Sequence, residues 1–255
     1  MDFLELKEYL DFKAYQYENP DFLDSDPLKL VHQFTKKEDR EIVGFLIATI
    51  AWGNRKSIIS NGEKLIDIMQ YEPFDFLINY DNPNQLKNFV HRTFNVQDLD
   101  FFLRSLQHIY LNHNGLEATF KPHPDYIGIK GRIVNFRKHF LEVTHDKRSE
   151  KHISNPLQNS ACKRLNMYLR WMVRPNNHGV DLGIWKSIPT SELYLPLDVH
   201  TSRNARFLGL LTRKQDDWKA LVELMETLQK MDPIDPSKYD FALFGIGVNE
   251  KGLFD

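Results

Sequence analysis

Apolar residues recur at helical spacing along most of this chain of 255 residues. Residues 38–52 become apolar almost all round after an acidic first turn, a pattern typical of a buried central helix. Clean period-two alternation is absent, and no Asn-Gly or Asp-Gly hairpin signal lies between apolar runs. The pattern therefore predicts an all-α fold of about ten helices. Six further segments are expected to be helical: 55–70, 97–112, 129–143, 160–174, 215–230 and 236–246.

Two polar stretches, 121–128 and 145–160, are predicted to be loops, and no low-complexity linker or internal repeat is present. We therefore expect residues 1–255 to form a single unit with two helical subdomains. These subdomains would cover approximately 38–145 and 155–250, with the N-terminal region packing on the second.

The composition excludes several classes of protein. The single cysteine, Cys162, rules out an intrachain disulfide framework and a four-cysteine metal or iron–sulfur site. No apolar run approaches the roughly 18 residues of a membrane helix, and the N-terminus does not resemble a signal peptide. A cytoplasmic protein is expected, with no membrane partner. The net charge of −2 means that any DNA-binding surface must be local.

The segment LPLDVHTSRNARFLGL, residues 195–210, predicts a short helix with defined ends. Asp198 is a good N-cap because its carboxylate can accept the unpaired amide hydrogens of the first turn. Gly209 is a good residue to follow the helix because it adopts a left-handed conformation without steric cost.

Residues 160–174 predict a second informative helix, with Ser160 as its N-cap. At about 100° per residue, one stripe of this helix is largely cationic, and the opposite face is apolar and expected to pack inward. The stripe suits a wall that faces an anion, although taken alone such a stripe is more often a solvated charged face. It contains Lys163, Met167, Arg170 and Arg174.

The segment around Asp198 resembles the signature of the helix-hairpin-helix DNA glycosylases, in which an aspartate at this place is the catalytic carboxylate. Lys163-Arg-Leu-Asn166 is similar to the run that carries the lysine of the lyase-competent members. The context of Asp198 resembles most the archaeal branch that removes 8-oxoguanine. The strings Ser160–Leu165 and Lys238–Gly245 also look like an uncharacterised bacterial family within this superfamily.

The resemblance implies a helix-hairpin-helix glycosylase-like fold, with two helical subdomains and a cleft between them. It implies a DNA base-excision glycosylase with lyase activity, acting on an oxidised purine in damaged duplex DNA or at abasic sites. Lys163 would be the nucleophile, and Asp198 would stabilise the cationic sugar. The expected base pocket comprises Trp52, Asn54, Met167, Asp240 and Phe244. The expected contacts to the DNA backbone come from Arg170, Arg174, His200, Arg203 and Arg206.

Two departures from the signature keep an alternative open. The hairpin segment, Asn155–Asn159, contains no glycine, although a phosphate-gripping hairpin needs free backbone amides. The overall charge is also slightly acidic. The alternative is a non-catalytic nucleic-acid-binding or protein-interaction protein on the same fold. For either function we expect a monomer with no cofactor. We also expect no metal, because no acidic residue lies at ligand spacing from the histidine pairs.

Overall fold

A computed structural model describes residues 1–250, and the chain in it is mostly helical. The chain divides into two compact units. Unit 1 joins residues 1–22 to the chain from residue 156 onward, and unit 2 comprises residues 23–155. Each unit is described by itself below.

Unit 2 is built around helix α3 (Lys37–Ile50), which is buried at every position from Glu41 to Ile50. This burial confirms the central helix expected over 38–52. The remaining helices of this part of the chain are α2 (Phe22–Ser25), η1 (Pro27–Gln33), α4 (Arg55–Ile68), α5 (Pro73–Ile78), η2 (Pro83–Leu86), α6 (Val96–Asn112), α7 (Leu116–Thr119), α8 (Gly128–Phe140) and η3 (Lys147–His152). Helices α4 and α5 pack on α3, and α6 packs against α5, α7 and α8.

A cluster of phenylalanine rings fills the core of unit 2. The ring of Phe45 on α3 lies 5.9 Å from that of Phe102 on α6 and 5.5 Å from that of Phe136 on α8. Phe140 lies 4.9 Å from Phe102, so the three helices share one aromatic core. Aromatic pairs at these separations add stability beyond their buried area.

A two-stranded antiparallel hairpin, β1 (Val90–His91) and β2 (Phe94–Asn95), precedes α6. The expectation of no strands is wrong at this point. Strands of two residues are too short to show an alternating pattern in the sequence. The hairpin ends in Asn95, whose side chain accepts hydrogen bonds from Gln97 and Asp98 and so begins α6 with a capping box.

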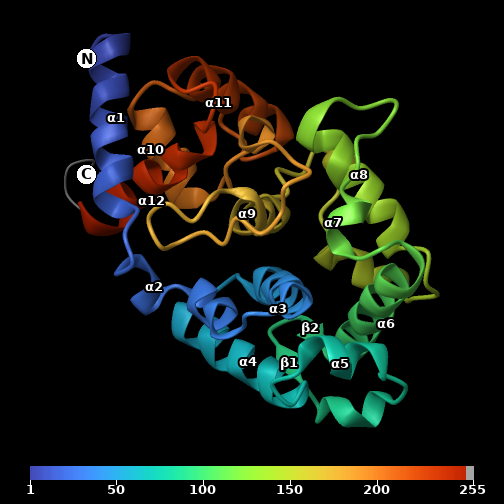
Figure 1. Ribbon diagram of the computed structural model, residues 1–255. Coiled ribbons are helices and arrows are strands. Elements are labelled where there is room, and N and C mark those ends of the chain that lie inside the picture. Colours follow the sequence, from blue (N-terminus) through green and yellow to red (C-terminus); the bar gives the residue numbers. More distant parts are fainter. Residues whose placement is uncertain (251–255) are drawn as a thin grey trace. The chain divides into compact units, whose positions relative to one another are not determined.

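Unit 1 joins the two ends of the described chain. Helix α1 (Phe3–Tyr17) packs along α12 (Tyr239–Asn249), and α10 packs on the same helix (Figure 1). Helix α1 was not among the predicted helices. The other helices of unit 1 are η4 (Pro156–Gln158), α9 (Lys163–Val173), η5 (Thr190–Glu192), α10 (Val199–Phe207), α11 (Trp218–Met231) and η6 (Pro236–Lys238).

Gly245 permits the close approach of α1 to α12. A Cβ atom at this position would overlap the ring of Tyr17. Tyr17 also donates a hydrogen bond to Glu250, and Tyr239 donates one to Asp11 over 2.8 Å. The N-terminal helix is therefore attached to the last helix by packing and by polar contacts.

All six further segments predicted to be helical contain helices, within a few residues of the expected ends. Over residues 1–250 the chain forms twelve α-helices, more than the predicted number, because several have only four to nine residues. Short 3₁₀ turns occupy part of the predicted loop 145–160. No helix within residues 1–250 has the length and apolar character needed to span a membrane.

Candidate functional site

Asp198 begins helix α10, as the sequence predicts. Its Oδ1 accepts hydrogen bonds from the amides of His200 and Thr201, each at 3.0 Å. The helix ends at Phe207, and Gly209, which follows the C-cap Leu208, has a φ of +73° as expected; the Leu210 amide donates to the Ala205 carbonyl over 2.8 Å. These two bonds fix the carboxylate at the start of the helix. Asp198 is half-buried.

Lys163 is the first residue of helix α9 and is half-buried. Its Nζ lies 3.8 Å from the sulfur of Met167, one turn further along the helix. The prediction that Ser160 caps this helix is wrong. Cys162 occupies the N-cap position in a left-handed conformation (φ +50°), and the Ser160 hydroxyl instead accepts from the Cys162 amide over 3.3 Å.

Asp240, on α12, is a buried acidic residue whose ionisation is affected by the charges of Lys163 and Asp198. This buried carboxylate accepts a hydrogen bond from Arg170. Burial and the negative charge of Asp198 raise the pKa of Asp240 to about 7, against the opposing effects of Arg170 and Lys163. Helix α10, which Asp198 caps, packs on α12, and Arg170 of α9 pairs with Asp240 of α12, so the helices of all three residues meet in unit 1.

Helix α9 is not an exposed cationic wall. Every residue from Leu165 to Val173 is buried, and Arg174 at the C-cap is buried as well. The guanidinium of Arg170 pairs with Asp181 over 3.2 Å and with Asp240. Arg174 pairs with Glu18 at 2.8 Å and with Asp235 at 2.8 Å.

This charge network corrects the expectation that Arg170 and Arg174 bind the DNA backbone. Buried charges need partners, and four carboxylates of unit 1 supply them. These partners are Glu18, Asp181, Asp235 and Asp240. None of the four was predicted to pair with an arginine, because they lie on separate segments of the chain.

The other predicted backbone contacts lie on α10. His200 and Arg203 are exposed, whereas Arg206 is half-buried. The guanidinium of Arg206 donates to the carbonyls of Arg213 and Lys214 and pairs with Asp216 over 2.6 Å. Arg206 therefore holds the turn that follows the helix.

The residues predicted for a base pocket belong to different units. Met167, Asp240 and Phe244 lie in unit 1, where the Phe244 ring is 6.3 Å from that of His200. Trp52 and Asn54 lie in unit 2.

In unit 2 both residues have local structural roles. Trp52 stacks on His152 with ring centroids 5.8 Å apart, and its carbonyl lies 3.2 Å from His91 Nε2. The Asn54 side chain caps α4 by accepting from the Ser57 amide over 3.3 Å.

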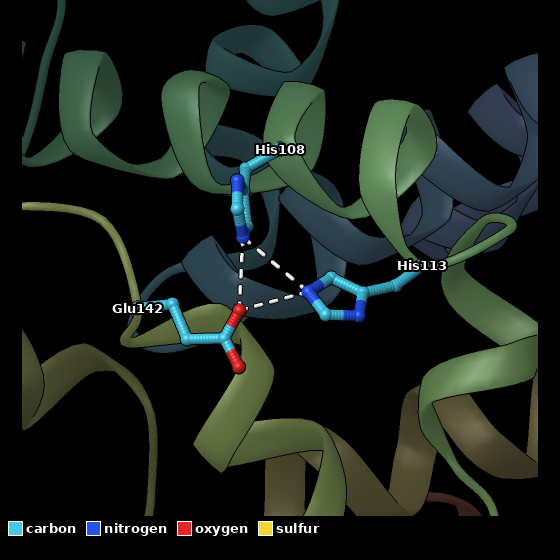
Figure 2. Close-up of side chains that lie close together, drawn as sticks. All are labelled: His108, His113 and Glu142. Atoms are coloured by element: carbon cyan, nitrogen blue, oxygen red, sulfur yellow. Dashed lines mark hydrogen bonds and ion pairs between the residues drawn. The ribbon is translucent and has the colours of Figure 1, made fainter.

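A second cluster of chemically active side chains lies within unit 2. Figure 2 shows His108, His113 and Glu142 with their ring nitrogens and one carboxylate oxygen pointing toward one another. Glu142 was missed as an acidic partner of these histidines because it lies on a different segment, beyond the end of α8. Within residues 1–250 this is the group whose ligand atoms are close enough together to hold a metal ion.

The chain was also compared with known proteins. No curated protein and no solved structure matches it. A family model described as a protein of unknown function (DUF2400) matches residues 26–249, which include α3, Lys163, Asp198 and Asp240. Because this match covers most of the chain, the protein belongs to the DUF2400 family.

Proposed function

We propose that this protein is a DNA base-excision glycosylase with associated lyase activity, acting on an oxidised purine. The observation that carries the proposal is that the helices of Lys163 and Asp198 both contact α12. Arg170 of α9 pairs with Asp240, and the ring of His200 on α10 lies 6.3 Å from that of Phe244. Local sequence around each residue also resembles the catalytic segments of helix-hairpin-helix glycosylases.

The chemistry requires a nucleophile and a carboxylate near one sugar carbon. The neutral amine of Lys163 would attack C1′ as the bond to the base breaks, and the departing base would take up a proton. The product is an aminal at C1′. Its C1′–O4′ bond would then break, with the nitrogen proton passing to O4′, and the imine formed by this ring opening permits cleavage of the strand. The fixed carboxylate of Asp198 would stabilise the positive charge that develops on the sugar. Because the amides of α10 hold Asp198 Oδ1, its position is set before the substrate binds.

The damaged base must leave the helical stack and enter a pocket. Met167 and Phe244 are the candidates that unit 1 contributes to this pocket: the Met167 sulfur lies 3.8 Å from Lys163 Nζ, and the Phe244 ring lies 6.3 Å from that of His200. His200 and Arg203 are exposed on α10, so they remain the candidates for contacts with phosphate. We further propose that the protein acts as a cytoplasmic monomer.

Borohydride trapping tests the proposal directly. Borohydride reduces an imine between protein and sugar to a stable crosslink, which a denaturing gel resolves. We expect the wild-type protein to crosslink to DNA that contains an oxidised purine or an abasic site. Lys163→Ala should abolish the crosslink, while Lys219→Ala, which removes an exposed lysine of α11, should leave it unchanged.

The Asp198→Asn variant distinguishes a catalytic role of Asp198 from its role as the cap of α10, because asparagine is also a good N-cap. We expect this variant to keep the thermal stability of the wild type and to lose base excision by about a hundredfold or more. It should retain trapping on a preformed abasic site, where no glycosidic bond remains. Equal crosslinking by Lys163→Ala would refute the assignment of the nucleophile.

A non-catalytic interaction protein is the second candidate. The burial of Arg170 and Arg174 favours it, because two cations expected at a DNA surface are neutralised inside unit 1. Absence of crosslinking with a panel of oxidised, deaminated and alkylated bases, and with abasic DNA, would support this candidate over the enzyme.

A further inference from the structure

The cluster formed by His108, His113 and Glu142 lies where two helices of unit 2 end. His108 is in the last turns of α6, and His113 is the C-cap of this helix. Glu142 follows Leu141, the C-cap of α8. Because α6 packs against α8, the two helix ends bring together side chains that are far apart in the sequence.

The ligand atoms of the cluster converge on one point (Figure 2). Nε2 of His108 and Nε2 of His113 lie 3.3 Å apart, and Oε2 of Glu142 lies 2.9 Å and 2.8 Å from them. A tetrahedral zinc site with bonds of about 2.0–2.1 Å places its ligand atoms about 3.3 Å apart. The two imidazoles already have this separation, and the carboxylate needs to move by only about half an ångström.

We propose that His108, His113 and Glu142 bind a divalent transition-metal ion of the zinc class. Two neutral imidazoles and a carboxylate suit such an ion, and this ligand set leaves a fourth position for water. The side chains of His113, His108 and Glu142 are 23%, 31% and 35% exposed, so an ion can reach them from solvent.

The ends of the two helices favour a cation at this point. The carbonyl ends of α6 and α8 carry partial negative charge, which stabilises positive charge within the last turn. The ion would also neutralise Glu142. A bound ion would therefore connect the C-terminal end of α6 to that of α8.

A fourth side chain is positioned to orient the carboxylate. Nδ1 of His139 lies 3.0 Å from Glu142 Oε1, the oxygen that does not face the other two histidines. This hydrogen bond would leave Oε2 free for the metal and hold the carboxylate plane in place. His139 is thus a positioning residue in the proposed site.

Asn112 contacts the second ring nitrogen of His108. Its amide nitrogen lies 3.0 Å from His108 Nδ1 and donates to the His108 carbonyl over 3.1 Å. For Nε2 to bind a metal, the proton must be on Nδ1, and the Asn112 amide would then turn its oxygen toward that proton and give up the bond to the carbonyl.

Isothermal titration of the full-length protein with Zn²⁺ tests the site. We expect one ion per chain with a Kd below about 10 μM. Co²⁺ should give the visible absorption of a tetrahedral complex. His113→Ala and Glu142→Gln should each weaken Zn²⁺ binding by about a hundredfold. His178→Ala, which removes an exposed histidine of unit 1, should bind as the wild type does.

Two further measurements distinguish binding at this site from the effects of misfolding and of adventitious metal binding. Zn²⁺ should raise the melting temperature of the wild type but not that of Glu142→Gln, whose circular dichroism should be unchanged. His139→Ala should lose about tenfold in affinity, and His139→Gln, which can still donate to Glu142, should recover most of it.

No Zn²⁺ binding by the wild type, or equal binding by His113→Ala and His178→Ala, would overturn the proposal. The site lies within unit 2, and metal binding is measured without DNA. Its outcome is therefore independent of the proposed glycosylase activity.

Discussion

At the scale of single residues, the ionisation of the buried Asp240 depends on its surroundings. Burial raises its pKa to about 7 from an ordinary value of 3.8, and Arg170 and Lys163 limit the increase. The pKa of the neighbouring Asp181 is also raised by burial. The folded protein therefore holds a proton on Asp240 over a pH range in which the unfolded chain has released it.

This difference predicts the direction of a pH effect on stability. The contribution of Asp240 is fully present below pH 4 and is lost as the pH rises toward 7, because the unfolded state then binds fewer protons than the folded state. We expect this loss to be on the order of 3 kcal/mol. Asp240→Asn should remove it, and urea denaturation at pH 5 and pH 8 would measure the difference between the variant and the wild type. Equal pH dependence in both proteins would contradict the prediction.

At the scale of elements, the contact between α1 and α12 depends on a position without a side chain. Gly245 of α12 faces the ring of Tyr17, so the two helix backbones approach closely there. A Cβ atom would force the helices apart or displace the tyrosine. Tyr17 cannot move without losing its hydrogen bond to Glu250.

Gly245→Ala is therefore expected to lower the free energy of unfolding by about 1–3 kcal/mol, although alanine favours helix more than glycine does. In a Tyr17→Ala background the same substitution should be neutral or stabilising, because the ring that it would overlap is gone. Chemical denaturation of the four proteins gives the coupling energy. An equal cost in both backgrounds would show that the ring is not the cause.

At the scale of the whole molecule, unit 1 is assembled from distant parts of the chain. Helix α1 contributes Leu6, Leu10 and Ala14 to its core. Residues 1–22 also supply two carboxylates that form ion pairs: Glu18 pairs with Arg174, and Asp11 pairs with Lys238. Removing these residues would expose an apolar face of α12 and leave the buried Arg174 with fewer partners.

Deletion of residues 1–22 should destabilise unit 1 and leave unit 2 nearly unchanged. Hydrogen exchange measures the local stability of both units in one experiment. We expect amide protection to fall in α9 and α12, while α6 and α8 serve as the internal control. Glu18→Gln removes the charge but keeps the helix, so its effect should be smaller. Unchanged protection in α12 would contradict this account of unit 1.

Features that depend on one or two turns of chain could be predicted from the sequence. The buried helix at 38–52 and the cap at Asp198 are both present in the structure. Features that depend on subtler local geometry were missed or misplaced, as with the hairpin at Val90–Asn95 and the start of α9. There a left-handed residue, Cys162, precedes the helix in place of the expected serine cap.

Where helices form follows from the local sequence, because helical spacing and caps involve residues within a few positions of one another. Which charges meet depends instead on how the helices pack. In the sequence, Arg170 and Arg174 belong to a cationic stripe of one helix. In the structure they pair with Glu18, Asp181 and Asp240, which come from other segments of the chain. Glu142 likewise completes the histidine cluster only because α6 and α8 end together. Such contacts join residues far apart in the chain, and no local spacing encodes their distance.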